Sequence, residues 1–172
     1  MADILITGCS GGGKSSLLEE LARRGYRTVL EPGRRLIAKG ITPWDDPHAF
    51  LLAAAEMARA DLAENRDEEA PVFYDRGLID ALAGLERLGE RDTAKALGSQ
   101  RPYGDGVFLA PPWPEIYRTD SMRRHDLDVA QAEYAHLSGL LPSLGYAPIE
   151  LPRLPIAERA DFVLAATDNR PG

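Results

Sequence analysis

The stretch that decides the fold of this 172-residue chain is DILITGCSGGGKS, residues 3–15. Its first part, residues 3–7, is a short apolar run of the kind that forms a parallel β-strand buried on both faces. From Gly8 to Ser15 it matches G-x-x-x-x-G-K-[ST] at every fixed position, and a helical pattern with leucines on one face follows as far as Arg24. A strand, a glycine-rich turn and a helix in this order predict a phosphate-binding loop, or P-loop.

The loop has the chemistry that nucleotide phosphates need. Its glycines let successive backbone N–H groups point inward at phosphate oxygens, and the positive end of the following helix faces the same anion. We expect Lys14 to neutralise the β- and γ-phosphates and the Ser15 hydroxyl to ligate Mg²⁺. The expected ligand is ATP or GTP with Mg²⁺, bound by Gly8, Ser10, Gly11, Gly12, Gly13, Lys14, Ser15 and Ser16.

The rest of the chain alternates between strand-like and helix-like segments. Strands are expected at residues 3–7, 26–31, 71–74, 107–110 and 147–151, and helices at 14–24, 34–39, 46–65, 78–88, 128–141 and 156–166. Because right-handed crossovers place the intervening helices on both faces of a parallel sheet, this order predicts a three-layer α/β fold with five parallel strands. No linker or repeat divides the sequence, so we expect residues 1–172 to form a single domain.

The composition narrows the range of partners. The net charge is -7, which disfavours binding to nucleic acid or to an anionic membrane, because both need a concentrated basic face. Cys9 is the only cysteine, so the chain has no disulfide framework and no cysteine metal cluster. No apolar run approaches the ~20 residues of a membrane span, and the N-terminus lacks the pattern of a secretory signal. We therefore expect a cytoplasmic protein whose partners are small molecules.

Charged residues follow the second and third expected strands, where ligands bind in open α/β sheets. Glu31 ends the second strand, and Asp75 and Arg76 end the third. We interpret Glu31 as the general base of a phosphoryl transfer and Asp75 as a carboxylate for Mg²⁺, with the reverse allocation as the alternative. A structural alternative makes Asp75 the N-cap of the next helix. Arg76 is expected to bind the nucleotide.

Arginines gather after the fourth expected strand. Arg118, Arg123 and Arg124 lie in a segment, about residues 112–127, that a kinase-like protein would use as a lid over the triphosphate. Arginines of a lid stabilise the charge that develops on a transferred phosphoryl group. We expect Arg123 and Arg124 to be catalytic and Arg118 to bind the nucleotide. The alternative is a solvated basic face that pairs with neighbouring aspartates.

Four stretches together resemble a known group of proteins. They are the P-loop, EPGRR at residues 31–35, DRG at 75–77 and FLAPPW at 108–113. In combination they look like the predicted AAA-type ATPases, which are similar to the kinase domain of bacterial nicotinamide riboside kinases. The resemblance implies a P-loop NTPase core with strand order 2-3-1-4-5, a kinase-like lid, and binding of MgATP or MgGTP.

The resemblance has limits that bear on function. Glu31-Pro32 is similar to the Glu-Pro that carries the base in deoxynucleoside kinases, but the third strand ends in Asp-Arg-Gly where those enzymes have Glu-Arg-Ser. The sequence also lacks a separate helical lid domain and the sensor arginines of a ring-forming ATPase.

Two classes of function fit the sequence. The leading hypothesis is a small-molecule kinase that transfers the γ-phosphoryl group to a hydroxyl of an unidentified acceptor, nucleoside-like or otherwise. The alternative is a regulatory ATPase or nucleotide-binding switch that hydrolyses slowly and acts on a protein partner. Glu31 and the arginines of residues 112–127 favour transfer. The absence of the guanine-reading Asn/Thr-Lys-x-Asp motif disfavours a GTPase switch.

Overall fold

The computed structural model describes residues 3–94, 97, 100–113 and 123–168. A single five-stranded parallel sheet organises them, with strand order β2-β3-β1-β4-β5. The strands are β1 (Asp3–Gly8), β2 (Arg27–Val29), β3 (Val72–Asp75), β4 (Val107–Ala110) and β5 (Ile149–Glu150). The helices are α1 (Lys14–Arg23), α2 (Pro32–Ala38), α3 (Pro47–Glu64), α4 (Leu78–Arg87), α5 (Arg123–Ser143) and α6 (Ile156–Asp168).

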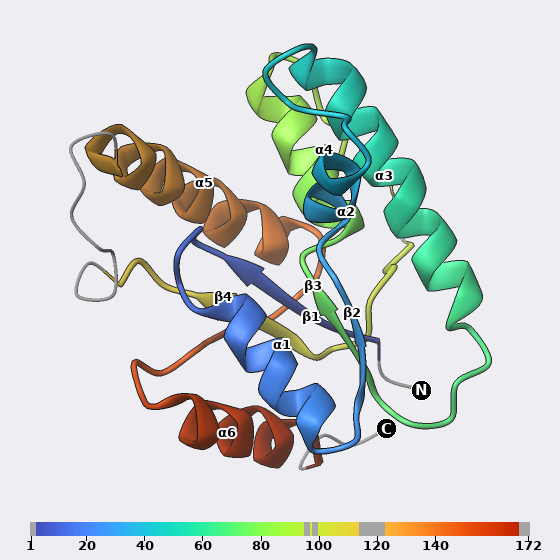
Figure 1. Ribbon diagram of the computed structural model, residues 1–172, viewed down its shortest axis with the longest axis vertical. Helices are drawn as coiled ribbons and strands as arrows, with labels where there is room; N and C mark the ends of the chain where they lie inside the picture. The colour runs from blue at the N-terminus through green and yellow to red at the C-terminus, as the bar shows by residue number, and fades with distance from the viewer. Residues whose placement is uncertain (1–2, 95–96, 98–99, 114–122, 169–172) are drawn as a thin grey trace.

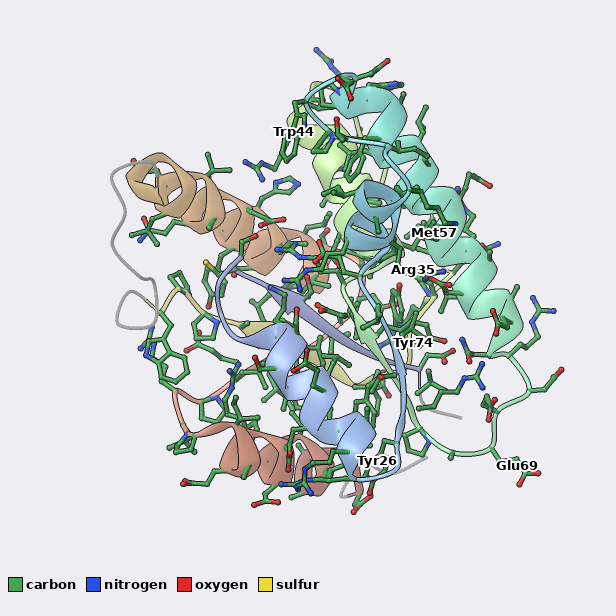
Figure 2. All side chains as sticks on the ribbon, viewed as in Figure 1. Tyr26, Arg35, Trp44, Met57, Glu69 and Tyr74 are labelled. Carbon is green, nitrogen blue, oxygen red and sulfur yellow. The ribbon has the colours of Figure 1, made fainter. Side chains whose placement is uncertain are left out.

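The helices cover both faces of the sheet, which confirms the three-layer prediction (Figure 1). The side chains of β1 contribute to two hydrophobic cores, one on each face of the sheet, since successive side chains of a strand point to opposite faces. Ile4 and Ile6 pack with leucines of α1 and with α6, whereas Leu5 packs on the side of α2, α3, α4 and α5. Side chains fill both spaces between the layers (Figure 2). The predicted strand order 2-3-1-4-5 is confirmed as well.

The element boundaries differ most from the prediction at β2, β5, α2 and α5. The edge strands β2 and β5 have three and two residues, shorter than expected, because each pairs with one neighbour only. Helix α2 begins at Pro32, where a proline fits the first turn because the missing N–H has no helical acceptor there. Helix α5 begins at Arg123, five residues before the expected start, so the end of the expected lid segment is helical.

The carboxyl ends of the central strands meet at one edge of the sheet. Ile6 of β1 is paired with Asp75 of β3, and Gly8 with Ala110 of β4. Gly8 has a φ of 108°, and a Cβ added there would lie 2.4 Å from the Ala110 carbonyl oxygen. Only glycine fits this crowded crossing. The P-loop therefore leaves the sheet between β3 and β4, at the edge where ligands of such sheets bind.

Among the helices of the described ranges, none combines the length and the hydropathy of a membrane-spanning segment.

Candidate active site

The P-loop lysine lies inside its own loop. The Lys14 side chain is 6% exposed, and its Nζ donates to the carbonyl oxygens of Cys9 at 2.7 Å and Gly8 at 3.4 Å. Burial and, to a smaller extent, the charge of Arg76 lower the pKa of Lys14 to about 8, against the opposing effect of Asp75 and other acids. A buried ammonium group of this kind is poised to gain an anionic partner such as a phosphate.

The next residue of the loop contacts the end of β3. Ser15 Oγ donates to Asp75 Oδ2 at 2.9 Å, and the Asp75 side chain is almost completely buried. The second carboxylate oxygen, Asp75 Oδ1, is buried without a hydrogen-bond partner among the described residues. A hydroxyl beside a carboxylate with a free oxygen suits Mg²⁺, which takes one or two protein oxygens and completes its shell with phosphates and waters. No group of three or more His, Cys, Asp or Glu in the described ranges forms a metal site by itself.

The start of α4 is capped by residues other than Asp75. The N–H of Gly77 donates to Asp80 Oδ2 at 3.1 Å, and the N–H of Leu78 donates to the hydroxyl of Tyr103 at 2.8 Å. The N-cap interpretation of Asp75 is therefore wrong. A Cβ added at Gly77 would lie 1.9 Å from the Tyr103 hydroxyl, which explains the glycine that follows Asp75-Arg76.

Arg76 connects the P-loop to three carboxylates, those of Glu31, Asp80 and Glu133. It is 7% exposed and has a φ of 56°, an uncommon conformation for a residue with a side chain. Its guanidinium donates to both carboxylate oxygens of Glu133, at 2.6 and 3.1 Å, and to Asp80 at 3.2 Å. Two further bonds of 3.0 Å reach the Gly8 carbonyl and Ser10 Oγ. Burial alone would lower the pKa of Arg76, but the carboxylates raise it well above its usual value.

Two of these carboxylates were not found from the sequence. Asp80 lies four residues after Arg76 on the first turn of α4, and Thr7 Oγ1 donates to it. Burial raises the pKa of Asp80 to about 6, although Arg76 and Thr7 favour its charged form. Glu133 comes from the middle of α5, and no local pattern in the sequence connects it to Arg76.

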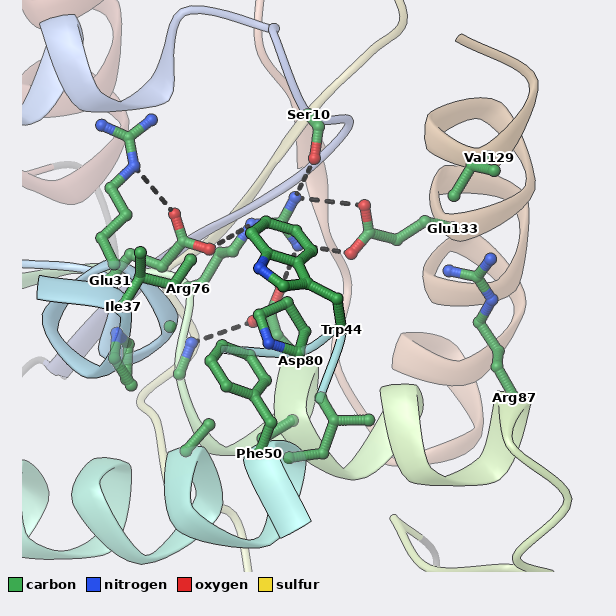
Figure 3. A pocket seen from close by; sticks show the side chains of 18 residues that line it. Ser10, Glu31, Ile37, Trp44, Phe50, Arg76, Asp80, Arg87, Val129 and Glu133 are labelled. Atoms are coloured by element: carbon green, nitrogen blue, oxygen red, sulfur yellow. Dashed lines mark hydrogen bonds and ion pairs between the residues drawn. The ribbon is translucent and has the colours of Figure 1, made fainter. Parts of the chain in front are cut away.

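Glu31 lines two neighbouring cavities, and Figure 3 shows it in the larger one. Its Oε2 is 3.2 Å from Arg34 Nε and its Oε1 is 3.6 Å from Arg76 Nε, and the side chain stays 26% exposed. The smaller cavity, which we call the phosphate cavity, measures about 360 Å³ and contains the P-loop residues Ser10, Gly11, Gly13, Lys14, Ser15 and Ser16. The larger, the acceptor cavity, measures about 590 Å³. Both are lined by Ser10, Glu31, Arg34 and Arg76.

The acceptor cavity has polar and apolar ends. Ser10, Glu31, Arg76, Asp80 and Glu133 line the end that adjoins the P-loop. The remaining wall is mostly apolar and comes from α2, the segment before α3, α3, α4 and α5, with Ile37, Pro43, Trp44, Phe50, Leu51, Ala54, Ala81 and Val129. Figure 3 shows the rings of Trp44 and Phe50 beside the cluster around Arg76.

A buried arginine supports the P-loop from behind. Arg159 of α6 is 2% exposed, and its Nη2 donates to the Gly12 carbonyl at 2.9 Å. Its guanidinium carbon is 5.7 Å from the centre of the Trp113 ring, a cation–π distance. No carboxylate of the described residues pairs with it, and burial lowers its pKa.

The expected lid arginines are only partly located. Arg118 lies outside the described residues. The backbone of Arg123 and Arg124 forms the first turn of α5, and their side chains also lie outside what the structure describes. Their assignment to a lid stays a prediction.

Comparison with known proteins gives a family and a fold. The sequence matches the model of an AAA domain family over residues 3–159. No protein of curated function matches it. Deoxyadenosine kinase from M. mycoides with bound dATP superimposes with a TM-score of 0.69 at 12% identity, covering 97% of this chain and 100% of the enzyme. Shikimate kinase from Acinetobacter baumannii in complex with shikimate gives 0.60 at 15% identity, covering 99% and 96%.

These likenesses differ in what they establish. At 12% and 15% identity the two kinases share the fold with this chain, and the resemblance to nicotinamide riboside kinases stays a prediction. The family match is of another kind, because it spans most of the sequence from β1 to α6. The chain belongs to this AAA domain family and has the fold of P-loop kinases.

Proposed function

We propose that the protein is a small-molecule kinase, which transfers the γ-phosphoryl group of ATP or GTP to a hydroxyl of a small acceptor. The observation that carries the proposal is the position of Glu31, which lines both the phosphate cavity and the acceptor cavity. A hydrolase needs room for a water molecule only. A second cavity of about 590 Å³, which is lined by the same carboxylate, suits an organic acceptor.

In the proposed reaction the acceptor hydroxyl donates its proton to Glu31 as its oxygen attacks the γ-phosphorus. A new P–O bond forms to the acceptor, and the bond to the β-phosphate oxygen breaks. Lys14 and Arg76 stabilise the negative charge on the phosphates. Ser15 and Asp75 would hold Mg²⁺, which neutralises charge on the β- and γ-phosphates. Arg118, Arg123 and Arg124 are proposed to cover the transferring group.

The structural neighbours support this class of acceptor. By their names, one neighbour acts on a deoxynucleoside and the other on shikimate, so this fold serves kinases of different small molecules. Asp75 is assigned to Mg²⁺ and Glu31 to the proton because Asp75 is buried against Ser15, whereas Glu31 is open to the acceptor cavity. Under the reverse allocation the base would be Asp75, which lines neither cavity.

The substitution Glu31→Gln tests the proposal, since it keeps the shape of the side chain and removes the base. We expect acceptor-dependent ADP formation to fall by about 10²–10⁴-fold, with the affinity for MgATP changed less than about threefold. The measurement is ADP release with a panel of nucleosides, sugars and short alcohols, beside calorimetric titration with MgATP. Glu56→Gln, at an exposed position of α3, is the matched control.

Two outcomes would contradict the proposal. If no acceptor raises ADP formation above the rate in water while MgATP binds tightly, the regulatory ATPase becomes the better hypothesis. If Glu31→Gln transfers phosphoryl groups at the wild-type rate, Glu31 is not the base.

A further inference from the structure

One cation of the acceptor cavity has no counter-charge among the residues that the structure describes. The cavity is lined by three carboxylates and three arginines, of which Arg87 comes from the last turn of α4. We propose that Arg87 binds an oxyanion of the acceptor, a carboxylate or a phosphate group, at the end of the molecule opposite its reacting hydroxyl. This inference rests on the proposed function, because it takes the cavity of about 590 Å³ as the acceptor site.

The other charges of the cavity are already paired. Glu133 and Asp80 bond to Arg76, and Glu31 lies between Arg76 and Arg34. Arg87 makes no hydrogen bond or ion pair with any residue that the structure describes. The end of the cavity near the P-loop therefore has three carboxylates against two arginines, whereas Arg87 brings a free positive charge to the other end. A neutral hydroxyl suits the first end and an anion suits the second.

The geometry of α4 sets the distance between the two ends. Asp80, which marks the end near the P-loop, and Arg87 both line the cavity and are seven residues apart on the helix. Seven residues are close to two turns, a separation of about 10 Å along the axis. Figure 3 shows Arg87 on the α4 side, beyond Trp44 from Glu31 and below Val129. An acceptor of one or two rings spans this distance.

The wall between the two ends is apolar and open. Trp44 is 76% exposed, Val129 56% and Ile37 43%, and all three line the cavity. Large apolar side chains that stay open within one cavity indicate a binding groove. The acceptor that fits has a flat or apolar body, with the reacting hydroxyl at one end and the oxyanion at the other.

A purely structural role for Arg87 makes a different prediction. A cation in the last turn of a helix stabilises it slightly by interacting with the helix dipole. In that case removal of the charge lowers stability slightly and leaves the choice of acceptor unchanged. The two roles are therefore separated by ligand preference, measured beside the melting temperature.

The test uses four probes of one shape. They are 4-(hydroxymethyl)benzoate, 4-(hydroxymethyl)phenyl phosphate, the neutral 4-(hydroxymethyl)benzamide and the cationic 4-(hydroxymethyl)benzylamine, each also made on a naphthalene ring for length. Binding is measured by ligand-detected NMR with Mg²⁺ and a non-hydrolysable ATP analogue present, and phosphorylation by mass spectrometry with MgATP. We expect at least one oxyanion probe to bind roughly tenfold more tightly than its carboxamide. The benzoate and phosphate arms identify which oxyanion is preferred.

Variants assign that preference to Arg87. Arg87→Met should remove the difference between acid and amide, Arg87→Lys should keep part of it, and Arg87→Glu should favour the cationic probe. Arg91→Met is the matched control, because Arg91 is exposed and does not line the cavity. Its probe preference should equal that of the wild type.

Three results would overturn the inference: no oxyanion probe binds the wild-type protein, the amide or the amine binds as well as the oxyanions, or Arg87→Met keeps the preference. Failure of the proposed function has a different signature. In that case the oxyanion probes bind through Arg87, but none is phosphorylated.

Discussion

The charge of Lys14 in the P-loop depends on pH, because the pKa of this side chain is lowered in the folded protein. Its pKa is lowered to about 8 by burial, so in the folded protein the neutral amine is populated from about pH 8 upward, whereas in the unfolded chain it stays charged up to about 10.5. Bound phosphates favour the ammonium form and raise this pKa again. Nucleotide binding is therefore expected to take up protons in alkaline solution.

We predict that MgATP binding at pH 8.5 takes up a measurable fraction of a proton, because part of the Lys14 population is neutral there before binding. Calorimetric titrations in two buffers of different ionisation enthalpy measure this fraction. Lys14→Met should weaken binding by at least about 100-fold and remove the proton uptake. Unchanged affinity in this variant would refute the assignment of the nucleotide site itself.

The residues found from the sequence are those with fixed spacing. Lys14 and Ser15 belong to one continuous motif, and Asp75 ends an apolar strand, so each has a local signal. Glu133 has none, because its partner Arg76 is 57 residues away and only the packing of α5 against the sheet brings them together. Arg87 was missed for a related reason, since an exposed charged residue at the end of a helix carries no sequence signal of the cavity that it lines.

At the scale of elements, the edge strands and α5 show why the ends of helices and strands were harder to predict than their presence. All five strands and all six helices that lie in the described ranges were anticipated from hydrophobic runs and turn residues. The lengths of β2 and β5 depend instead on a single neighbouring strand, which the sequence does not specify. The expected lid segment, about residues 112–127, overlaps the start of α5, which begins at Arg123 and not at the expected residue 128.

Helix α6 has a role in the P-loop that a single substitution tests. Arg159 binds the Gly12 carbonyl, and the N–H of the same trans peptide unit, that of Gly13, then points the opposite way, to the side where the phosphates are expected to bind. Arg159→Met removes this support but also removes a buried charge without a counter-charge. We expect MgATP affinity to fall roughly fivefold while the free energy of unfolding changes by less than about 1 kcal/mol.

Trp113, which contacts Arg159, reports on this prediction by its fluorescence. In a Trp44→Phe background it is the only tryptophan, so titration with MgATP isolates its signal. Arg23→Met, on the exposed face of α1, serves as the control. Equal losses of affinity and stability in Arg159→Met would show that α6 merely maintains the fold.

At the start of α4, the Tyr103 hydroxyl occupies the space that a side chain at Gly77 would need. Gly77→Ser should lower the free energy of unfolding by about 1–3 kcal/mol, because its Cβ would overlap the Tyr103 hydroxyl. Tyr103→Phe should cost about 1 kcal/mol through the lost bond to the Leu78 N–H. In the double variant the serine gains room and caps the helix, so the combined loss should be smaller than the sum. Strict additivity in urea unfolding would contradict this coupling.

At the scale of the whole molecule, Arg76 joins parts of the chain that are distant in sequence. Its guanidinium contacts the P-loop at Gly8 and Ser10, α4 at Asp80 and α5 at Glu133. It thereby links the phosphate cavity, the acceptor cavity and the helices on one face of the sheet. Removal of this charge leaves the buried carboxylate of Asp80 and the partly buried one of Glu133 without their arginine, which is costlier than the loss of an exposed ion pair.

The pH dependence of stability follows from that network. Asp80 already has a pKa raised to about 6 by burial, against the lowering effect of Arg76. Without Arg76 its pKa in the folded protein rises further above the unfolded value, so folding takes up a proton over a wider range, and lowering the pH favours the folded state. We predict that Arg76→Met lowers the free energy of unfolding by about 3–5 kcal/mol at pH 7.5 and by clearly less at pH 5.5.

Urea unfolding at the two pH values measures this difference. Arg59→Met is the control, because Arg59 forms an exposed pair with Glu56 and should change stability by less than about 1 kcal/mol at either pH. A deficit in Arg76→Met of the same size at both pH values would show that Arg76 stabilises the protein by packing and by its bonds to the loop. A deficit that shrinks with acid instead means that buried carboxylates determine it, so the site that positions the phosphates also determines how the fold responds to pH.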